Sequence, residues 1–271
     1  KRMRWPLRKI VQQFKDEVFE LIPCWLTTPE AASAIFAQEK QFDLVIFDEA
    51  SQCFAEQAFP AMYRGKQILV TGDQKQLQPN DLYSIKEEHE VDHPDAEIES
   101  LLQIAERYLP SIMLKGHYRS KHEALLTFSN QHFYKNQLNM LADYTAQERE
   151  NPLHWIKVNG TWEKQSNLIE AEKIAELLFE LHQKHPQKSI GVITFNIWQQ
   201  ELVWQKAEDY FLARGANLSA HLFVKNIENV QGDERDIILF SVGYAPDKNG
   251  KMNHHFGSLS MEGGENRLNV A

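Results

Sequence analysis

Two apolar segments that each end in acidic residues constrain this chain most. The stretch "DLVIFDEASQ" passes from four apolar residues directly into Asp48 and Glu49. The stretch "ILVTGDQKQLQP" follows about twenty residues later, and its apolar run ends at Gly72 and Asp73. Short apolar runs that contain β-branched residues and are bounded by polar residues are typical of buried strands. We therefore predict two strands whose carboxyl ends carry carboxylates.

Apolar periodicity predicts an alternation of strands and helices along the chain, which favours an α/β fold with mostly parallel sheets. A fresh strand–helix series starts near residue 111, so we predict two domains, at residues 1–110 and 111–271. The charged stretch 80–97 is predicted to be a loop. The predicted strands are 43–47, 67–71, 111–114, 154–158, 189–194, 221–224 and 236–242. The predicted helices are 7–20, 29–38, 54–62, 97–108, 120–134, 167–184 and 197–213.

Composition indicates a globular protein without a membrane segment. Apolar residues make up 42% of the 271 residues and charged residues 25%, and no apolar run approaches the roughly 18 residues that span a bilayer. Cys24 and Cys53 have no metal-ligand spacing, and we expect both to be buried, reduced thiols in a cytoplasmic protein. The net charge of −9 does not favour nucleic-acid binding through bulk electrostatics, so any such site must be local.

The acidic strand ends predict a site for a magnesium nucleotide. Ligands of doubly wound sheets bind at the carboxyl ends of strands, and Mg²⁺ prefers oxygen ligands while keeping several waters. We expect Asp48 to hold the metal and Glu49 to orient or deprotonate a water that attacks phosphorus. Gly72 permits close backbone approach beside Asp73, and Gln76 could reach a phosphate or the attacking water. If Asp48 and Glu49 are considered alone, the alternative to a metal site is a pair of exposed acids at a strand end that cap the next helix.

These motifs resemble a known family when they are taken in order. "VIFDEASQ" and "TGDQKQLQP" resemble motifs II and III of the superfamily 1 helicases, the RecA-like DNA and RNA motor ATPases. "LKGHYRS" resembles motif IV, and "IGVITFNIWQQ" resembles the second-domain segment that grips single-stranded nucleic acid. "NVQGDERDIILFS" resembles motif V, and "RLNVA" resembles the opening of motif VI. The resemblance covers nearly the whole chain and is strongest to the up-frameshift-like branch, particularly large bacterial helicase-related proteins.

The resemblance implies a RecA-like P-loop NTPase helicase fold, with a partial first domain and a nearly complete second one. It implies ATP and Mg²⁺ as cofactors and single-stranded nucleic acid as partner, with DNA favoured over RNA. It makes Arg119 the arginine that reaches the γ-phosphate and Glu234 the contact to the ribose. The alternatives are a surface salt bridge for Arg119 and a solvated acid in the charged "DERD" turn for Glu234. Gln231 and Gly232 would form a tight turn beside the nucleic acid or the nucleotide.

The same resemblance implies a set of backbone contacts to nucleic acid. Hydroxyls, amides and helix N-termini bind phosphates without net positive charge, which suits an acidic chain. Thr28 before Pro29 would also make a good helix cap, and capping and phosphate contact can hold together. Asn226 stands where many relatives have threonine, which makes its contact less secure. The implied contact residues are Thr27, Thr28, Thr194, Phe195, Asn196, Asn226 and Gln231.

Two departures from the family pattern predict low activity for the chain alone. The phosphate-binding loop "GxxxxGK[ST]" is absent, and Gly65–Lys66 lacks both the preceding glycine and the following Ser or Thr. The sequence also ends before the arginine expected in motif VI. We expect these parts upstream and downstream in a parent polypeptide, and we expect residues 1–271 alone to hydrolyse ATP poorly or not at all.

Two other functions compete with the motor. A non-catalytic nucleic-acid-binding or scaffold module would keep the fold but would not need Asp48, Glu49, Gln76 and Arg119 together. A carboxylate-dependent nuclease using Asp48 and Asp73 would need a lysine or further acids near the metal, and no convincing "ExK" follows a strand. The sequence therefore favours an ATP-dependent motor.

Overall fold

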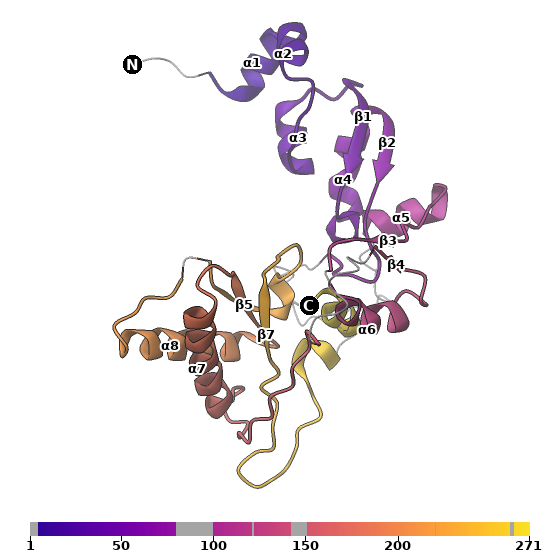
Figure 1. The fold of residues 1–271 in the computed structure, drawn as a ribbon. Helices are drawn as coiled ribbons and strands as arrows, with labels where there is room; N and C mark the ends of the chain where they lie inside the picture. The colour runs from indigo at the N-terminus through magenta and orange to yellow at the C-terminus, as the bar shows by residue number, and fades with distance from the viewer. Residues whose placement is uncertain (1–4, 80–99, 121, 142–150, 220, 261–262) are drawn as a thin grey trace, which may run out of the picture. The chain divides into compact units, whose positions relative to one another are not determined.

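A computed structural model describes residues 5–79, 100–120, 122–141, 151–219, 221–260 and 263–271 (Figure 1). The predicted loop at 80–97 lies outside these residues. The chain divides into two compact units, Lys1–Ile112 and Met113–Ala271. Among the described residues, no helix is long and apolar enough to cross a membrane.

The first unit places helices around a two-stranded parallel sheet. Strands β1 and β2 pair in parallel, with Phe47 opposite Val70 at the end of the ladder. Their long apolar runs make both strands, as predicted. The elements in chain order are α1 (Leu7–Gln13), α2 (Lys15–Leu21), α3 (Pro29–Ile35), β1 (Phe42–Phe47), the 3-10 turn η1 (Ala50–Gln52), α4 (Ala55–Met62), β2 (Gly65–Val70) and α5 (Leu101–Tyr108).

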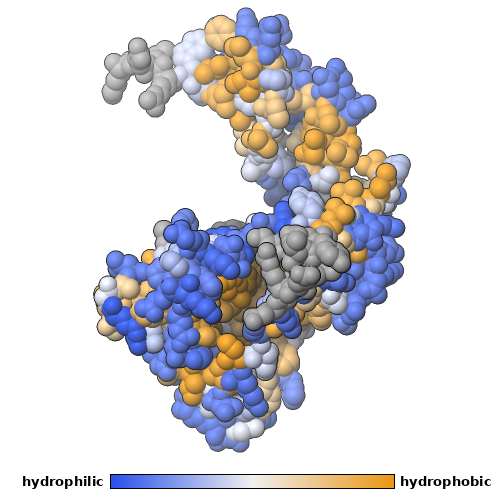
Figure 2. All heavy atoms as spheres, in the orientation of Figure 1, coloured by the Kyte–Doolittle hydropathy of each residue, from blue (hydrophilic) through white to orange (hydrophobic). Residues whose placement is uncertain are grey.

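The two faces of this sheet differ. One face lies over a core in which Phe47, Ala58 and Leu101 are buried. The other face exposes Leu44 and Ile46 of β1, among other apolar side chains, and Figure 2 shows apolar surface over this region. The alternation of buried and exposed positions is the period of two expected of a strand.

The second unit is built on a three-stranded parallel sheet of order β6-β5-β7 and a separate short pair, β3 and β4. Thr194 at the end of β5 lies opposite Asn226 of β6 and Ser241 of β7. The elements are β3 (Gly116–His117), α6 (Ala124–His132), β4 (Asn139–Met140), α7 (Leu168–Lys184), β5 (Ile190–Thr194), α8 (Ile197–Leu212), β6 (Phe223–Asn226), η3 (Ile227–Asn229), β7 (Ile237–Ser241), η4 (Gly257–Ser260) and α9 (Gly264–Val270).

Helices α7 and α8 pack together on this sheet. Ile174 and Leu178 of α7 and Val203 of α8 share a buried core with Val192 at the centre of β5. All five residues of β5 are buried, because a central parallel strand is covered on both faces, and this explains the apolar run at 190–193 that precedes Thr194. Parallel sheets flanked by helices confirm the predicted α/β class and agree with a RecA-like helicase fold.

The structure corrects several predicted elements. Residues 111–114 and 154–158 form no strand; Ile112 is 89% exposed and Trp155 is 83% exposed. Their apolar runs lack a described neighbouring strand to pair with, and periodicity alone cannot supply one. The predicted helix 7–20 is two helices, because the backbone of Phe14 leaves the helical region (φ −125°, ψ 47°). The expectation of two buried thiols is wrong for Cys24, which is exposed, and Cys53 is only half-buried.

Candidate functional site

The carboxyl ends of β1 and β2 are tied together by Thr71. The Thr71 N–H donates to the Phe47 carbonyl at 2.8 Å, which extends the ladder one residue beyond β2. The Thr71 hydroxyl donates to Asp48 Oδ1 at 2.9 Å. The Thr71 carbonyl in turn accepts from Ala50 N–H at 2.9 Å. Thr71 therefore fixes the rotamer of Asp48 and the start of η1, a role that no local sequence pattern indicates.

Glu49 occupies a sharp turn between β1 and η1. Its backbone is left-handed (φ 52°, ψ 40°), a conformation that costs a non-glycine residue roughly 1–2 kcal/mol. The Glu49 N–H donates to Asp48 Oδ1 at 3.1 Å, and both side chains are exposed. Backbone strain of this kind is concentrated at functional sites, because the surrounding structure must maintain it.

Gly72 lies against the same turn. A Cβ atom at Gly72 would lie 3.0 Å from the Ser51 amide nitrogen, 3.1 Å from that of Ala50 and 3.1 Å from Leu102 Cδ2. Two of these neighbours are backbone atoms and cannot rotate away. A side chain at Gly72 would therefore have to push these atoms aside by a few tenths of an ångström, so glycine favours the close approach of the end of β2 to the Asp48–Glu49 turn.

The structure also brings Asp73 and Gln76 together. One carboxylate oxygen of Asp73 accepts from Lys75 N–H at 2.9 Å, and the other accepts from Gln76 Nε2 at 3.0 Å. The Gln76 N–H donates to the Asp73 carbonyl at 3.1 Å, which closes a tight turn. The amide of Gln76 is thus held at the end of β2 with its orientation set by Asp73.

The oxygen donors at this edge suit Mg²⁺. Within the described residues, Asp48 Oδ1 accepts the hydrogen bonds from the Glu49 N–H and the Thr71 hydroxyl. The other carboxylate oxygen, Oδ2, can therefore coordinate a cation. No group of three or more His, Cys, Asp or Glu side chains in the described part of the chain could enclose a metal. A single carboxylate oxygen can serve Mg²⁺, which needs only one or two carboxylates when substrate phosphates and waters complete its shell.

In the second unit, two of the predicted nucleotide contacts meet. Arg119 Nε lies 2.5 Å from Glu234 Oε1, and the two side chains are 66% and 59% exposed. Ion pairs at this exposure contribute roughly 0–1 kcal/mol, so the pair can exchange with a ligand at little cost. Gly232 has a left-handed backbone (φ 83°), which gives the predicted tight turn two residues before Glu234.

The end of β5 holds three of the predicted nucleic-acid contacts. The Thr194 hydroxyl is fully buried and donates to the Asn196 carbonyl at 2.9 Å. Asn196 caps α8 by accepting from Gln199 N–H at 2.8 Å. The ring of Phe195 is buried in the core with Ile193 and other apolar residues, so its side chain is not available to stack on a base.

The remaining predicted contacts cap short helical segments. Asn226 Oδ1 accepts from Glu228 N–H at 3.2 Å at the start of η3, and Gln231 follows in the half-buried turn after η3. Thr28 accepts from Ala31 N–H at 3.3 Å with proline at the first position of α3, so the capping role is confirmed. The Thr27 hydroxyl donates to the Thr28 carbonyl at 3.3 Å. Phosphate contact by these residues stays a prediction.

A buried polar network at the carboxyl end of the β6-β5-β7 sheet was not predicted from the sequence. The Gln199 side chain accepts from Asn167 N–H at 2.7 Å and donates to Ser241 Oγ at 3.1 Å. Ser241 donates to Glu170 Oε1 at 2.8 Å, and Gly243 N–H donates to the same oxygen at 2.9 Å. The network joins the first turns of α7 and α8 to the end of β7. Asn167 Oδ1 accepts from the Glu170 N–H at 3.1 Å and so caps α7, while the side chain of Glu170 bonds to the end of β7.

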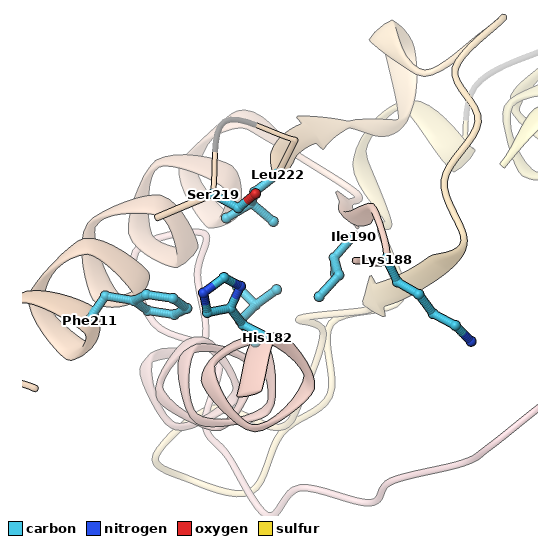
Figure 3. Close-up of a pocket in the computed structure, with 7 residues that line it drawn as sticks. His182, Lys188, Ile190, Phe211, Ser219 and Leu222 are labelled. Atoms are coloured by element: carbon cyan, nitrogen blue, oxygen red, sulfur yellow. The ribbon is translucent and has the colours of Figure 1, made fainter. Parts of the chain in front are cut away.

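The opposite end of this sheet carries a hollow but no predicted site residue. Figure 3 shows His182 beside Phe211, while Lys188 points away from both. Ligands of doubly wound sheets bind at the carboxyl ends of strands, and this hollow lies at the amino end of β5. We therefore assign no ligand to it. Its lining is Leu178, His182, Lys188, Ile190, Phe211, Ser219 and Leu222.

Comparisons with known proteins agree with this arrangement. A family model described as "AAA domain" matches residues 98–271, and a second model with the same description matches residues 1–80. An uncharacterized ATP-dependent helicase of Mycoplasma pneumoniae is 37% identical over 98% of this chain and 25% of its own length. One of Mycoplasma genitalium is 36% identical over the same shares, and one of Methanocaldococcus jannaschii is 25% identical over 65% of this chain and 29% of its own length. The chain spans about a quarter of the length of the first two relatives.

Proposed function

The chain belongs to the AAA-domain family of superfamily 1 helicases, and from this premise we propose that it carries the hydrolytic edge of an ATP-driven motor on single-stranded nucleic acid. The observation that carries the proposal is the bond between Thr71 and Asp48 at the ends of two neighbouring parallel strands. It supports a preorganised acidic edge, because the carboxylate needs no rearrangement to meet a cation.

In this proposal Asp48 holds Mg²⁺, which when bound would neutralise charge on the nucleotide phosphates. Glu49 accepts a proton from the attacking water, and its strained turn presents the carboxylate to solvent beside Asp48. Gln76 orients that water or a phosphate oxygen, with Asp73 holding its amide. Gly72 keeps the backbone close to the phosphates.

In the second unit, Arg119 supplies positive charge to the γ-phosphate, and Glu234 contacts the ribose. A guanidinium is suited to this role because it forms charge-assisted, bidentate hydrogen bonds with phosphate oxygens. The exposed pair that the two residues form supports the proposal, since both side chains belong to one local surface. Gly232 shapes the turn that presents Glu234.

Nucleic acid is held chiefly through its backbone. Thr194 and Asn196 are engaged at the start of α8, and the buried ring of Phe195 leaves the main chain of this segment to make the contact. Binding through amides and hydroxyls is compatible with a net charge of −9. We favour DNA over RNA as the strand. Thr27, Thr28, Asn226 and Gln231 complete this proposed set.

Substitution of the proposed base tests the function. In the complete polypeptide that carries residues 1–271, Glu49→Gln should abolish nucleic-acid-stimulated ATP hydrolysis and leave nucleotide binding intact, because only the proton acceptor is lost. Glu56→Gln, in the exposed first turn of α4, is the matched control and should hydrolyse ATP at the parent rate. Unchanged turnover in Glu49→Gln would exclude Glu49 as the proton acceptor. A parent polypeptide that binds nucleic acid but hydrolyses no ATP would favour a non-catalytic binding module instead.

A further inference from the structure

The segment that presents Arg119 is closed by a histidine. His117, the last residue of β3, is half-buried. Its Nε2 accepts from the Ser120 N–H at 3.1 Å and lies 2.8 Å from the Ser120 hydroxyl. The two residues therefore bracket Tyr118 and Arg119 in a loop of two residues. Tyr118 is 78% exposed at this loop, so little side-chain packing holds it.

The hydrogen-bond chemistry of this loop requires a neutral imidazole. A backbone N–H can only donate, so the Nε2 that faces Ser120 must carry a lone pair and the proton must sit on Nδ1. Protonation of Nε2 would set two donors against each other. The Ser120 hydroxyl could rotate to accept from the imidazolium, but the Ser120 N–H would lose its acceptor.

The orientation of Arg119 depends on this loop, because the Arg119 side chain is exposed and forms an ion pair with Glu234. An arginine at 66% exposure gains little orientation from packing. Its direction is set by the backbone at Tyr118 and Arg119, which the His117–Ser120 bonds close, and by the carboxylate of Glu234. Loss of either should broaden the positions that the guanidinium samples.

We propose that His117 is a positioning residue for Arg119, acting through the Ser120 amide, and that it serves only as the neutral imidazole. The inference rests on the proposed role of Arg119 and deepens it: the orientation of that arginine is linked to pH through a side chain that need not touch the nucleotide.

The electrostatics around His117 keep it neutral near pH 7. Burial and, second, the positive charge of Arg119 lower the pKa of His117 from its ordinary value. Strand β4, its neighbour in the sheet, contributes Asn139 and Met140 and no charged group. Because the neutral form is favoured in the folded state, its contribution is complete above the ordinary pKa of about 6.5 and is lost as pH falls through the lowered value.

The first test is independent of activity. In the complete polypeptide that carries residues 1–271, NMR of labelled histidine should show His117 as the Nδ1–H tautomer at pH 7.5. The Ser120 amide shift should follow the same titration as the His117 ring, and this coupling should be absent in His117→Gln. A Ser120 amide that does not respond to the titration of His117, or an Nε2–H tautomer, would overturn the proposal.

The second test reads the rate of ATP hydrolysis against pH. His117→Gln keeps an acceptor near the Nε2 position and does not titrate, so kcat at pH 7.5 should stay within about threefold of the parent and the acid limb due to His117 should vanish. His117→Ala should lower kcat roughly 10- to 100-fold, the size expected from misplacement of a catalytic group, with KM for ATP little changed.

Arg119→Ala tests the role of the arginine apart from that of His117. If Arg119→Ala leaves kcat unchanged, the proposed function of Arg119 fails. If Arg119→Ala is inactive while His117→Gln and the parent share one pH profile, the role of His117 fails and that of Arg119 stands. Should His117→Ala not fold, His117→Gln and the NMR titration still decide the question.

Discussion

Polar side chains are exposed at the carboxyl end of β1 but buried at the carboxyl end of β5. At the end of β1, Asp48 and Glu49 are exposed, and one hydroxyl from Thr71 holds the carboxylate of Asp48. At the end of β5, Gln199 and Ser241 are at most 1% exposed and bond to each other and to their neighbours. Exposed carboxylates can take a ligand, whereas a satisfied buried network fixes the positions of the elements that it joins. The exposed groups are therefore the ones that can react, and the buried groups hold the helices and strands around them in place.

The largest effect should come from an exposed group. Arg119→Ala in the complete polypeptide should reduce the kcat of ATP hydrolysis by about 10³-fold or more, the range known for arginines that stabilise transferring phosphoryl groups. Thermal stability should hardly change, because the ion pair with Glu234 is exposed. Arg214→Ala, at the end of α8 and stacked on Tyr210, is a control that should keep the parent kcat.

The buried network should show the reverse pattern. Gln199→Ala would leave the Asn167 N–H without its acceptor and remove a partner of Ser241. Each unsatisfied buried group costs about 1–3 kcal/mol, so denaturant unfolding of the variant should lose about 2–4 kcal/mol. Gln205→Ala, an exposed position on the same helix, should change the free energy of unfolding by less than about 0.5 kcal/mol. Equal losses in the two variants would contradict a network role.

The sequence predicted the carboxylates at the strand ends, but it did not predict the buried network around Gln199. An unbroken apolar run followed by Asp48 or by Gly72 is a local signal, and the strands that it predicted are present. Gln199 lies 42 residues from Ser241, and no local pattern indicates that their side chains bond. The prediction of a strand at 154–158 was wrong for the same reason. A strand needs a neighbouring strand to pair with, and the local apolar pattern around Trp155 does not indicate whether one is present.

The smallest effect should come from the tie between the two strands. Thr71→Val keeps the shape of the side chain but removes the hydrogen bond to Asp48 Oδ1. A single such bond contributes roughly 1 kcal/mol, so the Mg²⁺ concentration for half-maximal ATP hydrolysis should rise about fivefold. Thr71→Ser keeps the hydroxyl and should restore the parent value. No change in Thr71→Val would mean that Asp48 needs no support from β2.

The role of Asp48 as the residue that carries the metal of a bound nucleotide can be measured by calorimetric titration with a non-hydrolysable ATP analogue. Affinity would be measured with and without Mg²⁺ for the parent polypeptide and for Asp48→Asn. Mg²⁺ should strengthen binding to the parent at least tenfold and leave binding to Asp48→Asn nearly unchanged. An equal gain from Mg²⁺ in both proteins would contradict this role.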